Sequence, residues 1–492
     1  MENIAEVIIV ASNRGPIEHI IHEDRSFTTE RGKGGLITAL QFLGAQVKCL
    51  LWISAAMTEG DRAAAERVGN PYMPDGEKNI QPRYVTVPKG QYNKYYNKIA
   101  NPLLWFIQHN MWNPPYTPDI DKNVWDAWEN GYVPVNEAFA GEIIKSAGQV
   151  PDAPIMIQDY QLYLVGKMLR KAMPEVVITH FLHIPWPGPF CWRMLPEKMV
   201  LDILSSLLSC DIVGFQTKRD AKAFLATCEE FLQSLHSFEI NYKEQTIAYN
   251  GRTTHIRSYP ISINLEETRA LAYSEEADSC IEALGPYLKE KTIVRVDRMD
   301  PSKNIIRGFM AYDKLLAQYP EWRERVSFLA FLVPSREDIQ VYRDYRSKVE
   351  DIIEEINNRY GSERWQPITS FFEDNQAQAF AAMRIYDVLM VNPIADGMNL
   401  VAKEGAVINE SNGILVLSRS AGAFEELEPG VLAVSATDTE GMFEALYIAL
   451  CMGEDSKKAK SHFLRNAVEN NDINKWLAQQ LEDIATLTQS DN

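Results

Sequence analysis

The stretch Asp396-Gly-Met-Asn-Leu-Val-Ala-Lys-Glu404 decides the fold of the second half of this 492-residue chain. It follows a short apolar run at 387–391 and has the composition of a loop that opens a helix. Such a loop presents backbone N–H groups and the positive end of the helix dipole, which together favour a phosphate. Asp396 can accept hydrogen bonds from sugar hydroxyls, and Glu404 can reach the hydroxyls of a ribose. The stretch predicts a nucleotide-sugar loop, with an ordinary loop-to-helix turn as the alternative.

Short β-branched runs alternate with longer helical patterns along the whole chain. Helical patterns cover 219–235 and 304–318, among others. Nearly all-apolar strands are typical of parallel sheets that are buried on both faces, and strand–helix alternation indicates βαβ units. The predicted fold class is therefore α/β with doubly wound sheets. The predicted strands cover 7–11, 155–157, 176–182, 212–215, 292–296, 326–332, 388–391 and 414–417.

The length predicts two domains, because one hydrophobic core stops growing at about 250–300 residues. The natural break lies near 260–290, where Tyr259-Pro-Ile-Ser-Ile-Asn264 has the pattern of an extended crossing segment. An acidic helix and a new strand at Thr292 follow it. We predict a first Rossmann-like domain over 1–262, completed by a C-terminal helix over 472–492, and a second over 263–471. Ligands in such folds bind at the carboxyl ends of the strands.

The charge and composition exclude several classes of protein. The net charge of −18 argues against nucleic acid or an anionic membrane as partner. A phosphorylated ligand would then need a local basic pocket, so arginines and lysines inside motifs become candidates. The six scattered cysteines form no CxxC pair, and no apolar run approaches the roughly 20 residues of a membrane span. The N-terminus lacks the basic region of a signal peptide. We expect a cytoplasmic protein.

Two motifs lie near the start of the chain, after the first predicted strand. Ser12-Asn-Arg-Gly-Pro16 places Arg14 where it can clamp a phosphate, and Gly32-Lys-Gly-Gly-Leu36 lets the backbone approach a ligand near Gly35. An ordinary turn with a surface arginine is the alternative. The second motif lacks the Gly-Lys-Ser/Thr of a P-loop and the spacing of a dinucleotide GxGxxG, which disfavours an ATPase or a dehydrogenase.

Two cations, Arg298 and Lys303, flank the segment Met299-Asp-Pro-Ser302, which follows the first predicted strand of the second domain. At a strand end that faces the Asp396 loop they can neutralise a departing pyrophosphate and take the place of a divalent metal. A solvated helix start is the alternative for this pair. Asp119-Ile-Asp121 is a DxD motif, but it lies in a proline-rich loop without a neighbouring strand. We predict no metal site.

Further candidates follow other strands. His183 ends a buried strand, and the prolines after it direct the chain out of the sheet, although a lone histidine there is often a satisfied core residue. Asp159 and Tyr160 end the strand at 155–157. Core aromatics are the alternative for Tyr96 and Trp105, and a surface arginine is the alternative for Arg336.

These motifs occur in the order and approximate spacing of the trehalose-6-phosphate synthase family of retaining GT-B glycosyltransferases, family 20. The resemblance extends from Ser12 to about Trp476. It implies two facing Rossmann-like domains with a cleft between them. By resemblance, glucose 6-phosphate is held by Arg14, Tyr96, Trp105, Asp159, Tyr160 and Arg336. The transferred sugar is contacted by His183 and Asp396, and the donor pyrophosphate by Arg298 and Lys303. Gly35 lies near the donor diphosphate, the backbone amides come from Asn399, Leu400 and Val401, and the ribose acid is Glu404.

The resemblance also implies a reaction. The family uses front-face displacement with retention, in which the leaving phosphate oxygen takes the proton of the acceptor hydroxyl. The expected substrates are UDP- or GDP-glucose and a sugar phosphate. No cofactor or metal is expected, and neither nucleic acid nor a membrane is an expected partner. The oligomeric state is left open, a homo-oligomer included.

Several residues depart from the family pattern. Gln158 replaces the usual His, Asn304 the usual Gly after the lysine, and Ala395 the usual Arg before Asp396. Local similarity to validoxylamine 7′-phosphate synthase-type pseudo-glycosyltransferases appears in Pro301-Ser-Lys-Asn304 and His183-Ile-Pro-Trp-Pro187. The alternatives are therefore another phosphorylated acceptor, as in glucosylglycerol-phosphate synthases, a pseudo-sugar donor, or a catalytically silent sugar-phosphate sensor.

Overall fold

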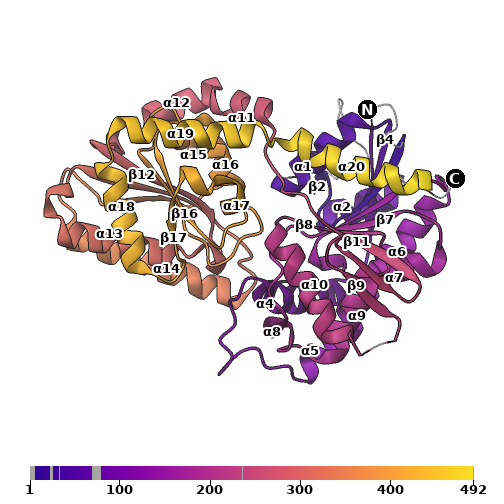
Figure 1. Cartoon of the computed structure of the whole chain (residues 1–492). Helices are drawn as coiled ribbons and strands as arrows, with labels where there is room; N and C mark the ends of the chain where they lie inside the picture. The colour runs from indigo at the N-terminus through magenta and orange to yellow at the C-terminus, as the bar shows by residue number, and fades with distance from the viewer. Residues whose placement is uncertain (1–5, 23–25, 33, 69–78, 235, 491–492) are drawn as a thin grey trace. The chain divides into compact units, whose positions relative to one another are not determined.

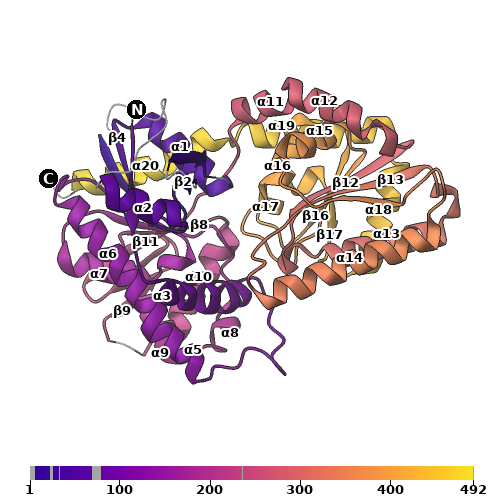
Figure 2. The same cartoon turned by 180° about the vertical axis from the view of Figure 1, so that it is seen from behind.

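The computed structural model describes residues 6–22, 26–32, 34–68, 79–234 and 236–490. The chain divides into two compact units. Unit 1 comprises the chain up to Pro260 together with the segment from Trp476 onward, and unit 2 is Ile261–Lys475. Each unit is a twisted sheet with helices on its faces, as Figures 1 and 2 show from opposite sides. The α/β prediction is confirmed in both units.

Among the residues that the structure describes, the sheet of unit 1 has nine strands, and the first seven in spatial order are parallel. An antiparallel pair extends one edge. A separate hairpin pairs β2 (Ile17–Ile21) with β3 (Phe27–Arg31). In spatial order the strands are β5 (Ile80–Val85), β4 (Cys49–Ala55), β1 (Val7–Ala11), β6 (Ile155–Gln158), β7 (Ile178–Phe181), β8 (Ile212–Phe215), β11 (Arg252–Ser258), β10 (Thr246–Tyr249) and β9 (Phe238–Asn241).

Helices of unit 1 cover the apolar strands. In the central strands β6, β7 and β8, every residue is buried. This is the pattern expected of parallel strands covered on both faces. The helices are α1 (Gly35–Gln46), α2 (Glu59–Val68), α3 (Lys89–Lys94), the π-helix η1 (Tyr95–Trp105), α4 (Phe106–Gln108), α5 (Lys122–Ala127), η2 (Trp128–Tyr132), α6 (Val133–Ala147), α7 (Val165–Ala172), α8 (Pro189–Trp192), α9 (Glu197–Leu207), α10 (Lys218–Leu232) and α20 (Ile473–Ser490).

The strand order of unit 1 reverses next to β1. From β1 the chain builds β4 and β5 on one side, and it returns to build β6, β7 and β8 on the other. The connections that leave the carboxyl ends of β1 and β6 therefore run toward opposite sides of the sheet. Such a topological switch point is the usual ligand site of an open α/β sheet. The motif around Arg14 follows β1, and Asp159-Tyr160 follows β6.

Unit 2 is a six-stranded, all-parallel sheet. Its switch point lies between β12 and β15. The strands, in spatial order, are β14 (Ile368–Phe371), β13 (Val326–Val333), β12 (Lys291–Arg298), β15 (Val388–Val391), β16 (Ile414–Ser418) and β17 (Leu432–Val434). The helices are α11 (Leu265–Ala272), α12 (Glu275–Leu284), α13 (Ile305–Gln318), α14 (Gln340–Tyr360), α15 (Gln376–Ile385), α16 (Leu400–Ile408), α17 (Phe424–Leu427), α18 (Thr439–Cys451) and α19 (Glu454–Glu469).

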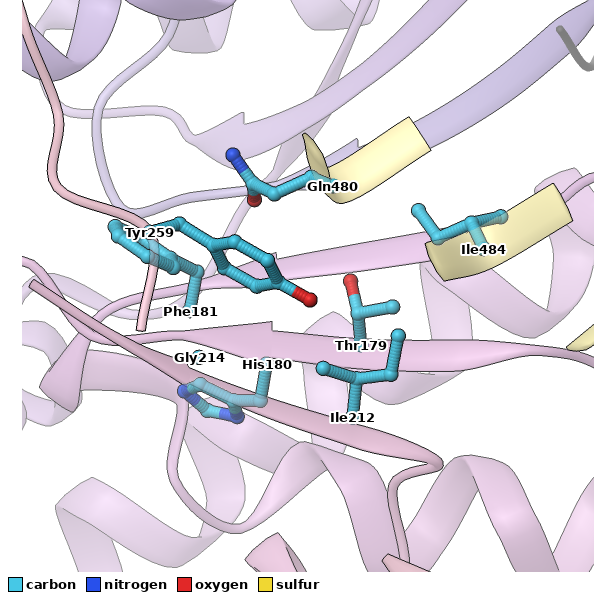
Figure 3. A pocket seen from close by; sticks show the side chains of 8 residues that line it. All are labelled: Thr179, His180, Phe181, Ile212, Gly214, Tyr259, Gln480 and Ile484. Atoms are coloured by element: carbon cyan, nitrogen blue, oxygen red, sulfur yellow. The ribbon is translucent and has the colours of Figure 1, made fainter. Parts of the chain in front are cut away.

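Helix α20 begins in unit 2 and packs on unit 1. Tyr259 Oη donates a 2.5 Å hydrogen bond to Asp483, and the Trp476 ring meets that of Phe181 edge-on at 5.7 Å. A small pocket remains where α20 lies over β7 and β8, with free space of about one water molecule. Figure 3 shows Gln480 and Ile484 of α20 above Thr179 and Ile212 of the sheet, with Tyr259 between.

The predicted elements match the observed ones to within a few residues. The strand predicted at 176–182 is shorter, Ile178–Phe181, and β12 begins one residue earlier than predicted. Helix α10 begins at Lys218 and ends at Leu232, whereas the predicted end, Leu235, lies outside the described residues. Among the residues that the structure describes, no helix is long and apolar enough to cross a membrane.

Candidate active site

The Asp396 loop connects β15 to α16 at the switch point of unit 2. Asn399 is the N-cap of α16: its φ is 77°, and its side-chain oxygen accepts from the Ala402 amide at 3.1 Å. The first amides of a helix have no intrahelical acceptor, so those of Leu400 and Val401 point out of the helix end. The predicted helix start after β15 is therefore present, and its binding of an anion stays a prediction.

A neighbouring turn fixes this loop from behind. The Gly422 amide donates to the Asp396 carbonyl at 3.0 Å, and the Ala423 amide donates to the Met398 carbonyl at 2.8 Å. The approach is so close that a Cβ on Gly422 would lie 1.8 Å from the Gly397 carbonyl oxygen. Glycine is required at position 422, and the loop backbone has little freedom to move.

Lys303 and Asp396 meet across the switch point. Lys303 Nζ lies 2.5 Å from Asp396 Oδ2, and the same oxygen accepts from Asn399 Nδ2 at 3.1 Å. Both partners of the ion pair are mostly buried. The structure thus brings together three of the predicted residues, and it places Lys303 beside the N-terminus of α16.

The main chain around Lys303 is held by a buried arginine to which sequence reasoning gave no role. Arg295 is fully buried in β12, and its guanidinium donates to the Lys303 carbonyl at 2.9 Å, to Asn392 Oδ1 at 2.5 Å and to Asp297 at 2.8 Å. Gly308 of α13 makes room for it, because a Cβ there would lie 2.3 Å from Arg295 Nη1. A charge between the apolar residues Val294 and Val296 of β12 was the available signal.

Asn304 explains one departure from the family pattern. It adopts the left-handed conformation, with φ 58° and ψ 38°, which glycine adopts without steric penalty and asparagine tolerates. Its side-chain amide also donates to the carbonyls of Asn392 at 2.9 Å and Ala436 at 2.6 Å. Asparagine therefore replaces glycine here and adds two buried hydrogen bonds.

Arg298 and Arg336 meet at a shared carboxylate. Arg336 follows β13, has φ 51°, and its Nη1 lies 3.3 Å from Asp300 Oδ2. Arg298 Nη2 lies 3.9 Å from the same oxygen and keeps 44% of its side chain exposed. The surface arginine considered for position 336 is wrong, since only 10% of that side chain is exposed.

Glu404 lies half-buried on α16, one turn beyond the first amides of that helix. Burial raises the pKa of its carboxyl group to about 7. Hydrogen bonds from hydroxyl groups favour the ionised form of a carboxylate. A ribose at this position would therefore compensate the carboxylate for its burial.

In unit 1, Asp159 organises the carboxyl ends of β6 and β7. It has φ 70°, a conformation rarely adopted outside glycine. Its amide donates to the Phe181 carbonyl at 2.7 Å, and its carboxylate accepts from the His183 amide at 3.1 Å. Backbone strain of this kind persists where the surroundings fix it, and it clusters at functional sites.

His183 is held between two glutamines. Its Nε2 lies 3.0 Å from Gln158 Oε1, and its Nδ1 lies 3.4 Å from Gln216 Nε2. Burial, followed by the charge of His180, lowers the pKa of His183 to about 3, so the imidazole is neutral. The departure at Gln158 thus contacts the predicted sugar-binding histidine directly. Sequence reasoning did not find Gln216.

The aromatic candidates gather around the same edge of unit 1. Tyr160 donates to Asn101 at 2.7 Å, and its ring lies 5.7 Å from that of Trp105, which stacks on His109 at 3.9 Å. Both Trp105 and Asn101 belong to the π-helix η1. Trp105 and Tyr160, both predicted to bind the acceptor, therefore lie next to each other in the structure.

A second group gathers at the end of β1. Tyr92 donates to Asn13, its ring stacks on that of Tyr96 at 5.6 Å, and Arg14 is exposed close by. Gly35 is the first residue of α1. Lys33, in the same motif, lies outside the described residues.

The DxD motif has a structural role. Asp121 caps α5 by accepting from the amides of Asn123 and Val124. Within the described ranges, no group of three or more His, Cys, Asp or Glu side chains is placed to hold a metal ion. The pocket under α20 contains none of the predicted site residues.

Comparison with known proteins agrees with this geometry. The model of glycosyltransferase family 20 matches residues 6–486. The chain is 30% identical to an alpha,alpha-trehalose-phosphate synthase [UDP-forming] of Pichia angusta over 95% of its own length and 97% of that protein. It is 27% identical to the A enzyme of that name from Dictyostelium discoideum, and there it spans only 61% of the longer relative.

A solved structure is similar over almost its whole length. The crystal structure of an alpha,alpha-trehalose-phosphate synthase (UDP-forming) from Burkholderia xenovorans in complex with glucose-6-phosphate matches with a TM-score of 0.82 at 27% identity. The match covers 98% of this chain and 100% of that one. The GT-B fold class is confirmed, while the cleft between the units stays a prediction.

Proposed function

The chain belongs to glycosyltransferase family 20, and from this premise we propose that it transfers glucose from UDP-glucose to glucose 6-phosphate. The product would be trehalose 6-phosphate, with retention at the anomeric carbon. The relatives from Pichia angusta and Dictyostelium discoideum are both named UDP-forming, and the Burkholderia xenovorans enzyme was crystallised with glucose-6-phosphate. These names support the donor and the acceptor.

One observation carries the proposal. At the switch point of unit 2, Lys303 pairs with Asp396 beside the N-terminus of α16, and Arg298 ends β12, the strand that precedes Lys303. Two cations and a helix end form a site for a diphosphate. The sugar-side acid Asp396 and the ribose-side acid Glu404 flank that site, in the order of the parts of a nucleotide-sugar.

Arg298, Lys303 and the N-terminus of α16 stabilise the negative charge that develops on the leaving diphosphate. The bond between C1 and the phosphate oxygen breaks while a bond between C1 and the acceptor hydroxyl oxygen forms on the same face. The hydroxyl proton passes to the departing phosphate oxygen, so no protein base is required. Fixed charges aimed at the developing diphosphate are then the main catalytic contribution. Lys303 is already fixed by Asp396 and by the Arg295 clamp on its main chain.

The first experiment is a nucleoside-diphosphate release assay. UDP-, GDP- and ADP-glucose are each combined with glucose 6-phosphate, glycerol 3-phosphate or buffer, and product masses are measured. We expect release from UDP-glucose that depends on glucose 6-phosphate and gives a phosphorylated disaccharide, unchanged by EDTA. Release that occurs only with glycerol 3-phosphate would show that glycerol 3-phosphate, and not glucose 6-phosphate, is the acceptor. Silence with every pair would overturn the proposal in favour of a pseudo-sugar donor or a sensor.

A further inference from the structure

A buried carboxylate lies at the end of β12, next to the cations of the candidate site. Asp300 is fully buried, and it opens the short 3₁₀ turn Pro301–Lys303. Its Oδ1 caps that turn by accepting from the Ser302 amide at 3.0 Å. This bond accounts for one oxygen of the carboxylate and leaves the role of the other to be explained.

The second oxygen faces two arginines that come from different strands. Oδ2 lies 3.3 Å from Arg336 Nη1 and 3.9 Å from Arg298 Nη2. Arg298 ends β12, whereas Arg336 follows β13. Because β12 and β13 are neighbouring parallel strands, their carboxyl ends bring the two guanidinium groups to one carboxylate.

Tyr342 of α14 completes the cluster. Arg336 Nη1 lies 2.5 Å from the Tyr342 hydroxyl, and its guanidinium carbon lies 5.4 Å from the centre of the ring. Burial and then the charge of Asp300 raise the pKa of Tyr342, while Arg336 and Arg298 oppose that rise. All four groups therefore interact electrostatically, and two positive charges share one negative charge.

Such an arrangement does more than stabilise the fold. Burying an ion pair gives little net stability, because desolvation offsets the attraction. A shared carboxylate does, however, fix the planar guanidinium forks, whose geometry suits phosphate oxygens. The cluster thus gathers two arginines at one buried carboxylate, in a protein whose net charge is −18.

We propose that Asp300 is a positioning residue that joins the two phosphate-binding arginines and so couples the binding of donor and acceptor. The inference rests on the proposed function, in which Arg298 binds the donor pyrophosphate and Arg336 the phosphate of the acceptor. A phosphate that draws either arginine toward itself changes the position of the carboxylate, and through it the other arginine. The coupling is reciprocal, as linkage requires.

The test compares wild-type chain with Asp300→Asn in steady-state kinetics with UDP-glucose and glucose 6-phosphate. Asparagine retains an oxygen that can cap the turn and removes the charge that holds the arginines. We expect KM to rise at least fivefold for both substrates, with a smaller change in kcat. A KM that stays within twofold for either substrate would overturn the inference. Absence of wild-type turnover would instead count against the proposed function.

Two controls separate positioning from folding. Asp438→Asn alters another N-cap aspartate, which accepts from the Gly441 amide at 2.9 Å at the start of α18, and it should leave both KM values unchanged. Tyr342→Phe releases Arg336 from one partner and retains the ring, so it should raise the KM for glucose 6-phosphate first.

A double-mutant cycle keeps the inference testable if Asp300→Asn does not fold. Arg298→Lys and Arg336→Lys are measured singly and together, with UDP-glucose and glucose 6-phosphate, in the presence of intact Asp300. Residues that share a partner give non-additive effects. We expect the double variant to differ at least threefold from the product of the single effects on kcat/KM. Additive effects would contradict coupling through Asp300.

Discussion

Arg298 ends β12, and 44% of its side chain is exposed to solvent. Its removal should therefore leave folding intact. If it stabilises the leaving diphosphate, Arg298→Ala removes about 2.7–4 kcal/mol of transition-state stabilisation. We expect turnover to fall at least a hundredfold, measured as nucleoside-diphosphate release at saturating substrates.

Arg359→Ala is the matched control for this loss. Arg359 has 43% of its side chain exposed and pairs with Asp313 and Glu355 on the surface of unit 2. Its removal should change neither turnover nor the melting temperature. Near-normal turnover in Arg298→Ala, with that control also unaffected, would remove Arg298 from the site.

Glu404 gives a prediction about pH. Its pKa of about 7 lies above the ordinary value for a glutamate, because burial disfavours the charged form. Ribose hydroxyls that donate to the carboxylate favour the charged form, so donor binding should release a proton. UDP-glucose affinity should then rise up to about tenfold between pH 6 and pH 8. Calorimetry in two buffers of different ionisation enthalpy measures both the affinity and the released proton.

Glu404→Gln tests the sign. The pKa of Glu404 is higher in the folded than in the unfolded chain, so its protonated carboxyl group stabilises the fold at low pH. This stabilisation is lost as the pH rises from the pKa of the unfolded chain through about 7. The variant should be more stable than wild type at pH 8. It should bind UDP-glucose more weakly, with an affinity that does not change between pH 6 and pH 8. A pH dependence of affinity that persists in Glu404→Gln would assign it to another group.

At the scale of elements, the turn between β12 and α13 depends on Asn304. Its left-handed backbone favours glycine, and its side chain satisfies two buried carbonyls. Asn304→Ala loses the two hydrogen bonds and places a residue that disfavours the left-handed conformation in this turn. Asn304→Gly loses only the hydrogen bonds. We expect the alanine variant to be about 1–2 kcal/mol less stable than the glycine variant in urea unfolding. Lys303, one residue away, should lose its position in the alanine variant, and turnover with it.

Asn412 provides the comparison for that pair. It has φ 50° in the turn before β16. Asn412→Gly should be nearly neutral, while Asn304→Gly should still lose stability because two buried carbonyls lose their donor. Equal stability of Asn304→Ala and Asn304→Gly would show that backbone conformation does not decide this turn.

The parts of the site that the sequence predicted are those with local signals. Asp396, Asn399 and Lys303 lie in short strings next to strand ends, where small and polar residues interrupt apolar runs. Topology then brings the strings together, since the sheet of unit 2 has its switch point, between β12 and β15, beside them.

The parts that the sequence did not predict depend on contacts between distant residues. Asp300 and Arg336 are 36 positions apart, and Gln216 meets His183 from another strand end. Neither pairing leaves a periodic pattern. The π-helix that carries Tyr96 and Trp105 and the antiparallel edge β9–β11 were missed for the same reason, because tertiary packing overrides local preference there.

At the scale of the whole molecule, the chain passes between the units twice, near Pro260 and near Trp476. The second passage lies within α20, whose first amide donates to the Ile263 carbonyl of unit 2 while Trp476 packs on Phe181 of unit 1. Each unit has its own buried core. The stability of unit 1 therefore depends on a segment that follows unit 2 in the sequence.

Trp476→Ala tests this dependence. The side chain is almost fully buried, and large-to-alanine changes in a core typically destabilise by about 3–5 kcal/mol. We expect faster amide exchange in β7 and β8 of unit 1 and unchanged exchange in β13 of unit 2, measured by hydrogen-exchange mass spectrometry. Trp365→Ala, which removes a buried tryptophan bonded to the Val326 carbonyl, should do the reverse. Parallel loosening of both units in either variant would mean that they unfold as one cooperative body. The ring of Trp476 also lies 6.5 Å from that of His183, so turnover should fall in the first variant even where unit 2 stays folded.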